Sequence, residues 1–449
     1  MTMMMAAALF SAALVAGQSA PALDAVVKTR LDADLQCRLG AYALPGGRYL
    51  TITGSQGHPR NLSYGRSEGG LGRLEAKPDG AYVSPTPGGP KMTFEPCASG
   101  LMRMEDGGAS VTGQRLPLVV RETRFQSGDV SLRGKLVLPP GGQAKALAVW
   151  IGGSNNDPDT DDVAWQYELA RRGVGVFVYD KRGTGGSTGD LTADFNLRAA
   201  DTAAAVAEAR RLAPKVAKVG VIGASQGGWV APLTATLTPL DFVVPAFALA
   251  EGVPGQDKAV VAEQLRRAGQ GEDAQRQAAE LAAAAEVVVR SNFTTGYEAL
   301  ETLKAKYQGE AWYAAIQPRS YTGILMRITP EQARSGGPAQ AQGLSFNYEP
   351  RPVIERIKPR QLWLLGGSDR QAPSARTVQI LQEIQHQRAD LDVVVFPAAD
   401  HGLTERFKGA GGETSAYSPG LFDLLASWIL TGTPTATDTT ATILSGRKS

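Results

Sequence analysis

The sequence predicts an α/β protein with a mostly parallel sheet, a small β domain ahead of it and a helical insertion within it. From residue 118 onward, short apolar strands alternate with helices, which is the pattern of parallel βαβ units. Three long helical patterns then follow one another with no strand between them, and a turn-rich stretch of short strands precedes the alternation. A chain of 449 residues is long enough for a large α/β core and a smaller domain.

Composition excludes several classes of partner. The formal net charge is +2, and there is no long run of Lys and Arg, so we expect neither nucleic acid nor an anionic membrane surface as a partner. No apolar segment is long enough to span a membrane stably. The chain contains three histidines and two cysteines, and none has the spacing of metal ligands. We therefore expect no metal and no other cofactor, and the sequence leaves the oligomeric state open.

The N-terminus resembles an export signal. Residues 6–16 are apolar and small or polar residues follow them, which predicts a signal peptide over residues 1–20, although no Lys or Arg precedes the apolar run. This predicts a periplasmic or secreted protein. In such a protein, Cys37 and Cys97 most simply form one disulfide; otherwise they are two buried thiols.

Residues 22–117 predict the small β domain, because turn signals such as Pro45-Gly46-Gly47 and Pro78-Asp79-Gly80 separate short apolar runs. We assign no chemistry to it. The next domain, 118–430, begins with a hairpin and continues with alternating elements. The expected strands are 119–125, 130–138, 146–151, 174–179, 219–224, 242–250, 361–365 and 391–396. The expected helices are 165–171, 197–212, 229–237, 375–387 and 421–430.

Residues 256–343 interrupt this alternation with helices at 259–267, 274–290 and 297–307. We interpret them as a helical cap over the site. Within the cap, Trp312 and Tyr313 either line an acyl pocket or pack helices together. After residue 430 the chain is rich in Thr, Ala and Ser, which predicts a flexible tail over 431–449.

The strongest local signal is a Gly-x-Ser-x-Gly turn, with Ser225 between Gly223 and Gly227. The turn follows an apolar, β-branched run and precedes a helix. A serine on such a tight strand-to-helix turn has its hydroxyl pushed out of the sheet. This predicts Ser225 as a nucleophile, in preference to a chance turn in a glycine-rich chain.

A serine nucleophile needs a base, and the base needs an orienting acid. His401 is the only histidine in a loop at the expected carboxyl end of a strand, whereas His58 lies in a turn of the β domain and His386 in a polar helix. The chain order Ser, acid, His favours Asp369, which follows the strand 361–365.

Two other carboxylates remain as alternatives to Asp369 as the orienting acid. Glu251 follows the preceding strand, and Asp400 is adjacent to His401. Neighbouring residues seldom face each other, so Glu251 is the stronger of the two.

An oxyanion intermediate needs two hydrogen-bond donors. We assign them to the backbone N–H of Gln226, which follows the nucleophile, and to that of Ser154, in the turn after strand 146–151. Another glycine-rich turn, residues 179–187, lacks the ending of a phosphate-binding P-loop. We interpret it as a structural turn near the site.

Together these motifs resemble the α/β-hydrolase superfamily, in particular bacterial carboxylesterases with an N-terminal β domain and a helical insert. The shared features are the turn from Tyr179 to Ser187, the serine turn, the Gly-x-x-Asp loop at 366–369 and the late histidine. The resemblance covers residues 118–430. One departure is Gly152, where the family commonly has histidine.

The resemblance implies an α/β-hydrolase fold and hydrolysis of short acyl esters through an acyl-serine intermediate, with a small-molecule ester as partner. A thioesterase is an alternative. So is a serine peptidase related to prolyl oligopeptidases, although the β domain is too short for the propeller of those enzymes. A non-catalytic binding protein with the same fold is the remaining alternative.

Overall fold

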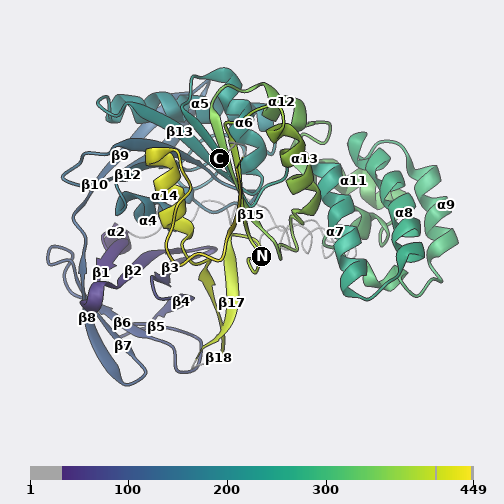
Figure 1. Ribbon diagram of the computed structural model, residues 1–449. Helices are drawn as coiled ribbons and strands as arrows, with labels where there is room; N and C mark the ends of the chain where they lie inside the picture. The colour runs from purple at the N-terminus through teal and green to yellow at the C-terminus, as the bar shows by residue number, and fades with distance from the viewer. Residues whose placement is uncertain (1–32, 410–411, 446–449) are drawn as a thin grey trace.

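The computed structural model describes residues 33–409 and 412–445. The predicted signal peptide, residues 1–20, lies outside this range. Figure 1 shows a sheet covered by helices, a second, antiparallel sheet below it and a group of helices projecting to one side. The candidate site belongs to the first sheet.

The first sheet has nine strands in the order β19-β16-β15-β14-β13-β11-β12-β10-β9. They are β9 (Leu118–Ser127), β10 (Val130–Pro140), β11 (Ala146–Ile151), β12 (Val174–Tyr179), β13 (Lys218–Ala224), β14 (Phe242–Ala246), β15 (Arg360–Gly366), β16 (Leu391–Phe396) and β19 (Thr442–Ser445). The neighbours from β12 to β16 pair in parallel. The outer pairs, at β9, β10 and β19, are antiparallel.

Helices cover both faces of this sheet. They are α3 (Asp159–Asp162), α4 (Trp165–Ala170), α5 (Phe195–Leu212), α6 (Gly227–Leu237), α12 (Arg351–Arg356), α13 (Ala375–Gln385) and α14 (Leu421–Thr431). Successive strand side chains point to opposite faces. Accordingly, Val149 of β11 packs in the cluster that contains α5 and α6, while its neighbour Ala148 packs in the cluster that contains α4 and α14. Strands β11, β12, β13 and β14 are buried on both faces along their whole length, except at the exposed Lys218 of β13.

The helical insertion connects β14 to β15 and projects to the right in Figure 1. It consists of α7 (Val253–Arg267), α8 (Glu272–Arg290), α9 (Tyr297–Tyr307), the 3₁₀ turn η3 (Tyr313–Ala315), α10 (Tyr321–Leu325) and α11 (Pro330–Ala341). Helix α11 starts at a capping box, in which the Thr329 hydroxyl accepts from the Gln332 N–H and the Gln332 side chain accepts from the Thr329 N–H.

The second sheet has ten strands in the order β17-β18-β4-β3-β2-β1-β8-β7-β6-β5. Its N-terminal members are β1 (Gly40–Ala43), β2 (Tyr49–Ser55), β3 (His58–Arg66), β4 (Leu71–Ala76), β5 (Tyr82–Val83), β6 (Lys91–Phe94), β7 (Leu101–Asp106) and β8 (Ala109–Arg115), with α2 (Ala33–Gln36) and η2 (Pro45–Gly47) beside them. A further pairing of β4 with β5 closes these strands into an antiparallel ring. Cys37 and Cys97 form a disulfide in this region.

Two C-terminal segments differ from the sequence expectations. Strands β17 (Thr404–Gly409) and β18 (Gly412–Tyr417) form a hairpin that joins the N-terminal sheet, where Ser415 pairs with Leu71 of β4. The segment predicted as a flexible tail over 431–449 contains the edge strand β19, which pairs antiparallel with β16. The physical reason is that an exposed edge of the first sheet supplies the hydrogen-bond partners that this short segment lacks alone.

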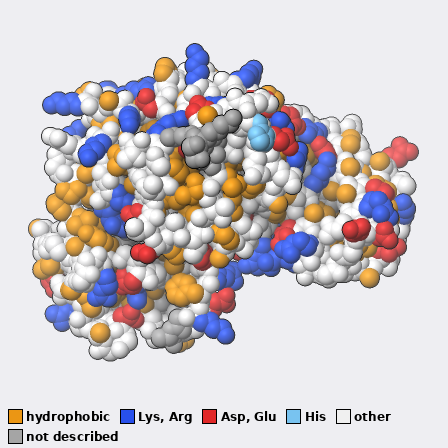
Figure 2. Space-filling model, in the orientation of Figure 1, with side chains coloured by type: hydrophobic (Ala, Val, Ile, Leu, Met, Phe, Trp, Pro, Cys, Tyr) orange, Lys and Arg blue, Asp and Glu red, His pale blue; other side chains and the backbone are white. Residues whose placement is uncertain are grey.

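The two sheets are in contact through apolar side chains as well as through the β17–β18 hairpin. Val137 of β10 and the α4 residues Tyr167 and Ala170 belong to the apolar cluster that fills the N-terminal ring. On the face shown in Figure 2, basic and acidic side chains are interspersed over the ring and over the insertion, and the outline is hollowed between them. No helix in the described part of the chain is long and apolar enough to cross a membrane.

Candidate active site

Ser225 occupies the sharp turn between β13 and α6, with a positive φ of 52°. Its N–H donates to the Ala246 carbonyl of β14 at 2.9 Å, which fixes the turn against the next strand. A Cβ at Gly223 would lie 2.2 Å from the Gly227 carbonyl oxygen, and a Cβ at Gly227 would lie 2.3 Å from the Ile151 carbonyl oxygen, so neither residue can carry a side chain without a shift of the backbone. The left-handed backbone is costly for a serine, and such strain is typical of functional positions.

His401 lies between Ser225 and Asp369. Its Nε2 is 3.0 Å from the Ser225 Oγ, and its Nδ1 is 2.8 Å from Asp369 Oδ2. The other oxygen of Asp369 accepts hydrogen bonds from the N–H groups of Gln371 and Ala372, each at 2.8 Å. This geometry suits an imidazole that donates from Nδ1 to the carboxylate and presents an unprotonated Nε2 to the Ser225 hydroxyl.

The two alternative carboxylates do not contact the imidazole. Asp400 binds the Arg370 guanidinium at 2.8 Å and accepts the His401 backbone N–H. Burial raises the pKa of Asp400, but the N–H of His401 and the contacts from Arg370 outweigh it and hold the pKa below its usual range. Glu251 instead accepts a hydrogen bond from Thr377 at 3.3 Å, and burial raises its pKa. The other histidines are also elsewhere, His58 in β3 and His386 at the end of α13.

Phe247 was not identified from the sequence. It follows β14 with a positive φ of 41°, and its N–H donates to the Leu364 carbonyl at 2.7 Å. The ring packs edge-on against the His401 imidazole, with centroids 5.1 Å apart at 78°. Its position in the carboxyl-terminal half of the expected strand 242–250 was the available signal, and the structure ends that strand at Ala246. The contact restricts rotation of the imidazole away from Ser225.

The turn after β11 lies against Ser225. A Cβ at Gly153 would be 3.4 Å from the Ser225 Cβ, and Ser154 and Gln226 line the same cavity as Ser225. A Cβ at Gly152 would lie only 2.0 Å from Asp159 Oδ2. The Asp159 carboxyl therefore occupies the space that a histidine side chain at position 152 would need.

Arg198 is a second residue that sequence reasoning missed. It projects from α5, is 3% exposed, and donates to the Gly152 carbonyl and to the Gln226 side-chain oxygen. It thus connects the two backbone segments to which we assign the oxyanion donors. A basic residue on the buried side of an alanine-rich helix was the signal that could have identified it.

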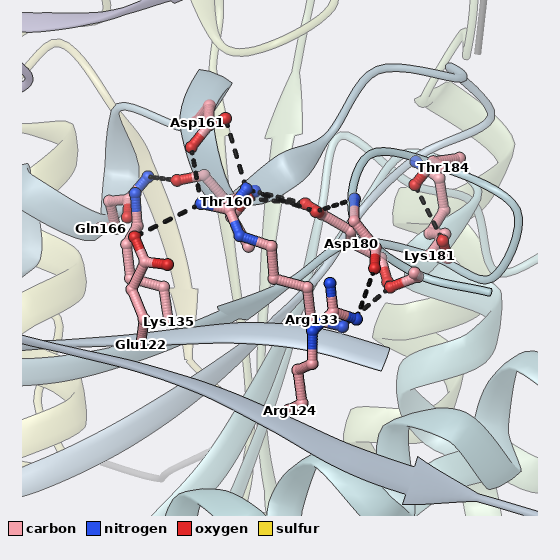
Figure 3. A network of polar contacts seen from close by, with 12 residues as sticks. Glu122, Arg124, Arg133, Lys135, Thr160, Asp161, Gln166, Asp180, Lys181 and Thr184 are labelled. Atoms are coloured by element: carbon pink, nitrogen blue, oxygen red, sulfur yellow. Dashed lines mark hydrogen bonds and ion pairs between the residues drawn. The ribbon is translucent and has the colours of Figure 1, made fainter. Parts of the chain in front are cut away.

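The glycine-rich turn after β12 is fixed by a buried polar network (Figure 3). Asp180 accepts hydrogen bonds from the Thr160 N–H and hydroxyl at 3.1 and 2.7 Å, and Arg133 lies 3.5 Å away. Burial raises the pKa of Asp180, and Arg133 opposes this. The next residue, Lys181, lines the cavity beside Ser225. The network therefore fixes the position of a cavity-lining cation.

The cavity beside Ser225 has a volume of about 110 Å³. Its walls come from the first sheet and from the insertion, which contributes Val253, Gln256 and Tyr321. Trp312 and Tyr313 do not line it. Trp312 is buried against Tyr307, with ring centroids 5.5 Å apart, and therefore packs helices together.

A family model and several solved structures match parts of this chain. The model of the Alpha/beta hydrolase family matches residues 136–407. Among solved structures, the esterase PF2001 of Pyrococcus furiosus is 16% identical, with a TM-score of 0.39 over 63% of this chain and 84% of that chain. The acylaminoacyl peptidase of Pyrococcus horikoshii is 13% identical, with a TM-score of 0.39 over 76% and 50%.

A hypothetical protein of Pseudomonas aeruginosa, PA2218, is 21% identical, with a TM-score of 0.38 over 64% of this chain and 87% of that chain. Values this low carry no inference about activity, and comparison with curated proteins gave no match. The family match spans more than half of the chain and confirms the resemblance seen in the motifs. The protein therefore belongs to the alpha/beta hydrolase family and is a hydrolase of that type.

Proposed function

We propose that this protein is a serine carboxylesterase that hydrolyses short acyl esters. The observation that carries the proposal is the position of His401, within hydrogen-bond distance of both Ser225 and Asp369. A serine hydroxyl becomes an effective nucleophile only when a base accepts its proton. The two distances match those expected of such a base and its orienting acid.

In the proposed reaction, the Ser225 Oγ attacks the ester carbonyl while His401 Nε2 accepts its proton. Asp369 stabilises the resulting imidazolium, and the N–H groups of Ser154 and Gln226 donate to the oxyanion. Collapse of the tetrahedral intermediate breaks the bond to the alcohol, which leaves with the proton from His401. Water then attacks the acyl-serine by the same route and releases the acid and free Ser225.

The size of the cavity supports a short acyl group. At about 110 Å³ it is smaller than the pockets for drug-sized ligands, which are about 300–1,000 Å³. Residues of the insertion form part of its wall. We therefore propose that the insertion acts as a cap that excludes water from the site.

A location in the periplasm or outside the cell is part of the same proposal. The Cys37–Cys97 disulfide supports it, because disulfides persist mainly in oxidising compartments. Its test is fractionation of cells that produce the full-length chain. Recovery in the cytosol with both thiols reduced would contradict it.

Ser225→Ala tests the mechanism. With p-nitrophenyl butyrate as substrate, we expect kcat/KM to fall by about 10⁴- to 10⁶-fold, because the nucleophile is lost. A fluorophosphonate probe should label the wild-type protein and not the variant. Ser335→Ala, which removes an exposed hydroxyl of α11, serves as the matched control and should keep both properties.

A panel of esters, thioesters and aminoacyl amides with matched acyl groups then separates the three hydrolase classes. We expect esters to give the highest kcat/KM. A preference for thioesters or amides would reassign the activity. Retained hydrolysis in Ser225→Ala would refute the assigned nucleophile.

A further inference from the structure

The cavity beside Ser225 contains a buried arginine without an acidic partner. The Arg198 guanidinium is 3% exposed and lines the cavity together with Ser225. In the described part of the chain its hydrogen bonds go to two neutral oxygens, the Gly152 carbonyl and the Gln226 amide, and it forms no ion pair. A charge in such a position is unfavourable unless an anion compensates it.

Lys181 supplies a second cation to the same cavity. It is 5% exposed, donates to the Asn155 side chain at 2.9 Å and lies 3.6 Å from Asp159. Asp159 is thus its ion-pair partner, but Asp159 is not among the residues that line the cavity, and none of those residues is acidic. The walls of the cavity therefore present two cations and no carboxylate.

The lowered pKa values of Arg198 and Lys181 also favour an anionic ligand. Burial lowers the pKa of Arg198, against the opposing effects of Tyr179, Asp159 and Asp201. Burial also lowers the pKa of Lys181, although Asp159 opposes this. Both side chains would hold their protons more firmly with an anion beside them, so an anionic ligand gains interaction energy that an uncharged ligand of the same shape does not.

From these observations we propose that the substrate is an ester with an acidic group a few bonds from the ester carbonyl, bound by Arg198 and Lys181. The inference rests on the proposed esterase function and specifies its substrate class. The acidic group belongs either to the acyl part, as in a monoester of a dicarboxylic acid, or to the alcohol part, as in an ester of a hydroxy acid. The small volume of the cavity limits the distance between the ester and the acid.

The test compares pairs of esters that differ only in this charge. In the acyl arm, monomethyl succinate is compared with methyl butyrate, so that a carboxylate replaces a methyl group. In the alcohol arm, acetoxyacetate is compared with ethyl acetate, so that a carboxylate again replaces a methyl group. Hydrolysis by the purified full-length protein is followed as proton release at constant pH, and the charged-to-neutral ratio of kcat/KM is determined for each pair.

We expect a ratio of about 10 to 100 in one arm, which is the usual effect of a hydrogen bond to a charged group. Arg198→Gln and Lys181→Met should each lower this ratio severalfold. The ratio is taken within one variant, so a general loss of catalysis cancels. This separates anion binding from a role of Arg198 in holding the Gly152 turn, because a displaced turn would slow both esters equally.

Lys145→Met is the matched control, since Lys145 is exposed and lies outside the cavity. It should leave the ratio unchanged. Fluorophosphonate labelling of each variant reports whether the site has folded. If Arg198→Gln does not fold, the charged-to-neutral ratios of the wild type and of Lys181→Met still test whether the cavity binds an anion.

Hydrolysis of the neutral esters with ratios near or below 1 in both arms would overturn the inference and leave the esterase proposal intact. A ratio that stays the same in Arg198→Gln and Lys181→Met would also overturn it. Failure to hydrolyse any ester, together with no labelling of Ser225, would refute both proposals.

Discussion

The nine-stranded and ten-stranded sheets contribute to the site in different ways. In the first, parallel strands that are buried on both faces end in the loops of Ser225, Asp369 and His401. The second is antiparallel and provides none of these side chains, yet the chain enters its β17–β18 hairpin three residues after His401. The comparison indicates that one sheet carries the three proposed catalytic residues while the other restrains the loop of His401.

The restraint on the histidine loop is visible in its hydrogen bonds. Asp400 N–H donates to the Thr404 carbonyl at 2.8 Å, and Ser418 N–H donates to the Leu403 carbonyl at 2.9 Å. These two hydrogen bonds hold together the two ends of the β17–β18 hairpin, where the chain enters it at Thr404 and leaves it at Tyr417. Its second strand then pairs with β4 of the N-terminal ring. A change in the ring can therefore reach the imidazole through the hairpin.

We expect the largest effect on kcat from a change in the nine-stranded sheet, which carries the proposed catalytic residues. Asp369→Asn should lower kcat by about 10³- to 10⁴-fold, because the imidazole loses the anion that orients it. Glu251→Gln is the matched control and should change kcat by less than about tenfold, since Glu251 does not contact His401. Both are measured with p-nitrophenyl butyrate. A greater loss in Glu251→Gln would assign the acid to β14 instead of β15.

Shortening the β17–β18 hairpin, which connects the two sheets, should have an intermediate effect on kcat. Replacing residues 405–416 with Asn-Gly would join Thr404 to Tyr417, which are paired directly, by a tight two-residue turn. We expect kcat to fall by about 10- to 100-fold, because small displacements of a catalytic group carry costs of this size. KM should change little, since no residue of the hairpin lines the cavity.

The control for this replacement exchanges the exposed pair Arg406 and Glu413, which lie 3.7 Å apart. The double variant Arg406→Glu/Glu413→Arg keeps the hairpin and should keep wild-type kcat. If the shortened chain also retains wild-type kcat, the ten-stranded sheet does not position His401.

The smallest expected effect on activity comes from the disulfide of the ring. Cys37 and Cys97 enclose a 60-residue separation, and on the chain-entropy model a loop of this length stabilises a fold by about 4 kcal/mol. Cys37→Ser/Cys97→Ser should lower the unfolding midpoint in urea while kcat/KM under native conditions stays near wild type. Adding reductant should shift the wild-type curve toward that of the variant and leave the variant curve in place. Coincident curves for all samples would contradict a stabilising bond.

The sequence predictions for the candidate site rest on local signals. A strand, a turn of small residues and a helix identify the position of Ser225, and strand ends identify those of Asp369 and His401. The signals at Arg198 and Phe247 are weaker, because the contacts of both residues depend on which segments the fold places beside them. The positive φ of Phe247, for example, arises where its N–H meets the carbonyl of Leu364 on the neighbouring strand.

Long-range pairing explains the remaining differences. Strand β19 forms because its backbone meets the edge of β16, with Ile443 opposite Val394, and composition alone favours disorder for this segment. The hairpin after His401 was missed for the same reason, since its partner β4 lies more than three hundred residues earlier in the chain. The sequence also could not decide whether Trp312 lines a pocket, because that depends on how α8 and α9 pack.

The close approach of Gly152 and Asp159 has a consequence for protein engineering. Introducing a histidine at position 152 would require a smaller residue at 159, and removing the Asp159 carboxyl would leave Lys181 without its ion-pair partner. We therefore expect the effect of a substitution at any one of positions 152, 159 and 181 to depend on the residues at the other two. Combinatorial libraries that vary them together should yield folded variants that single-site saturation at 152 cannot reach.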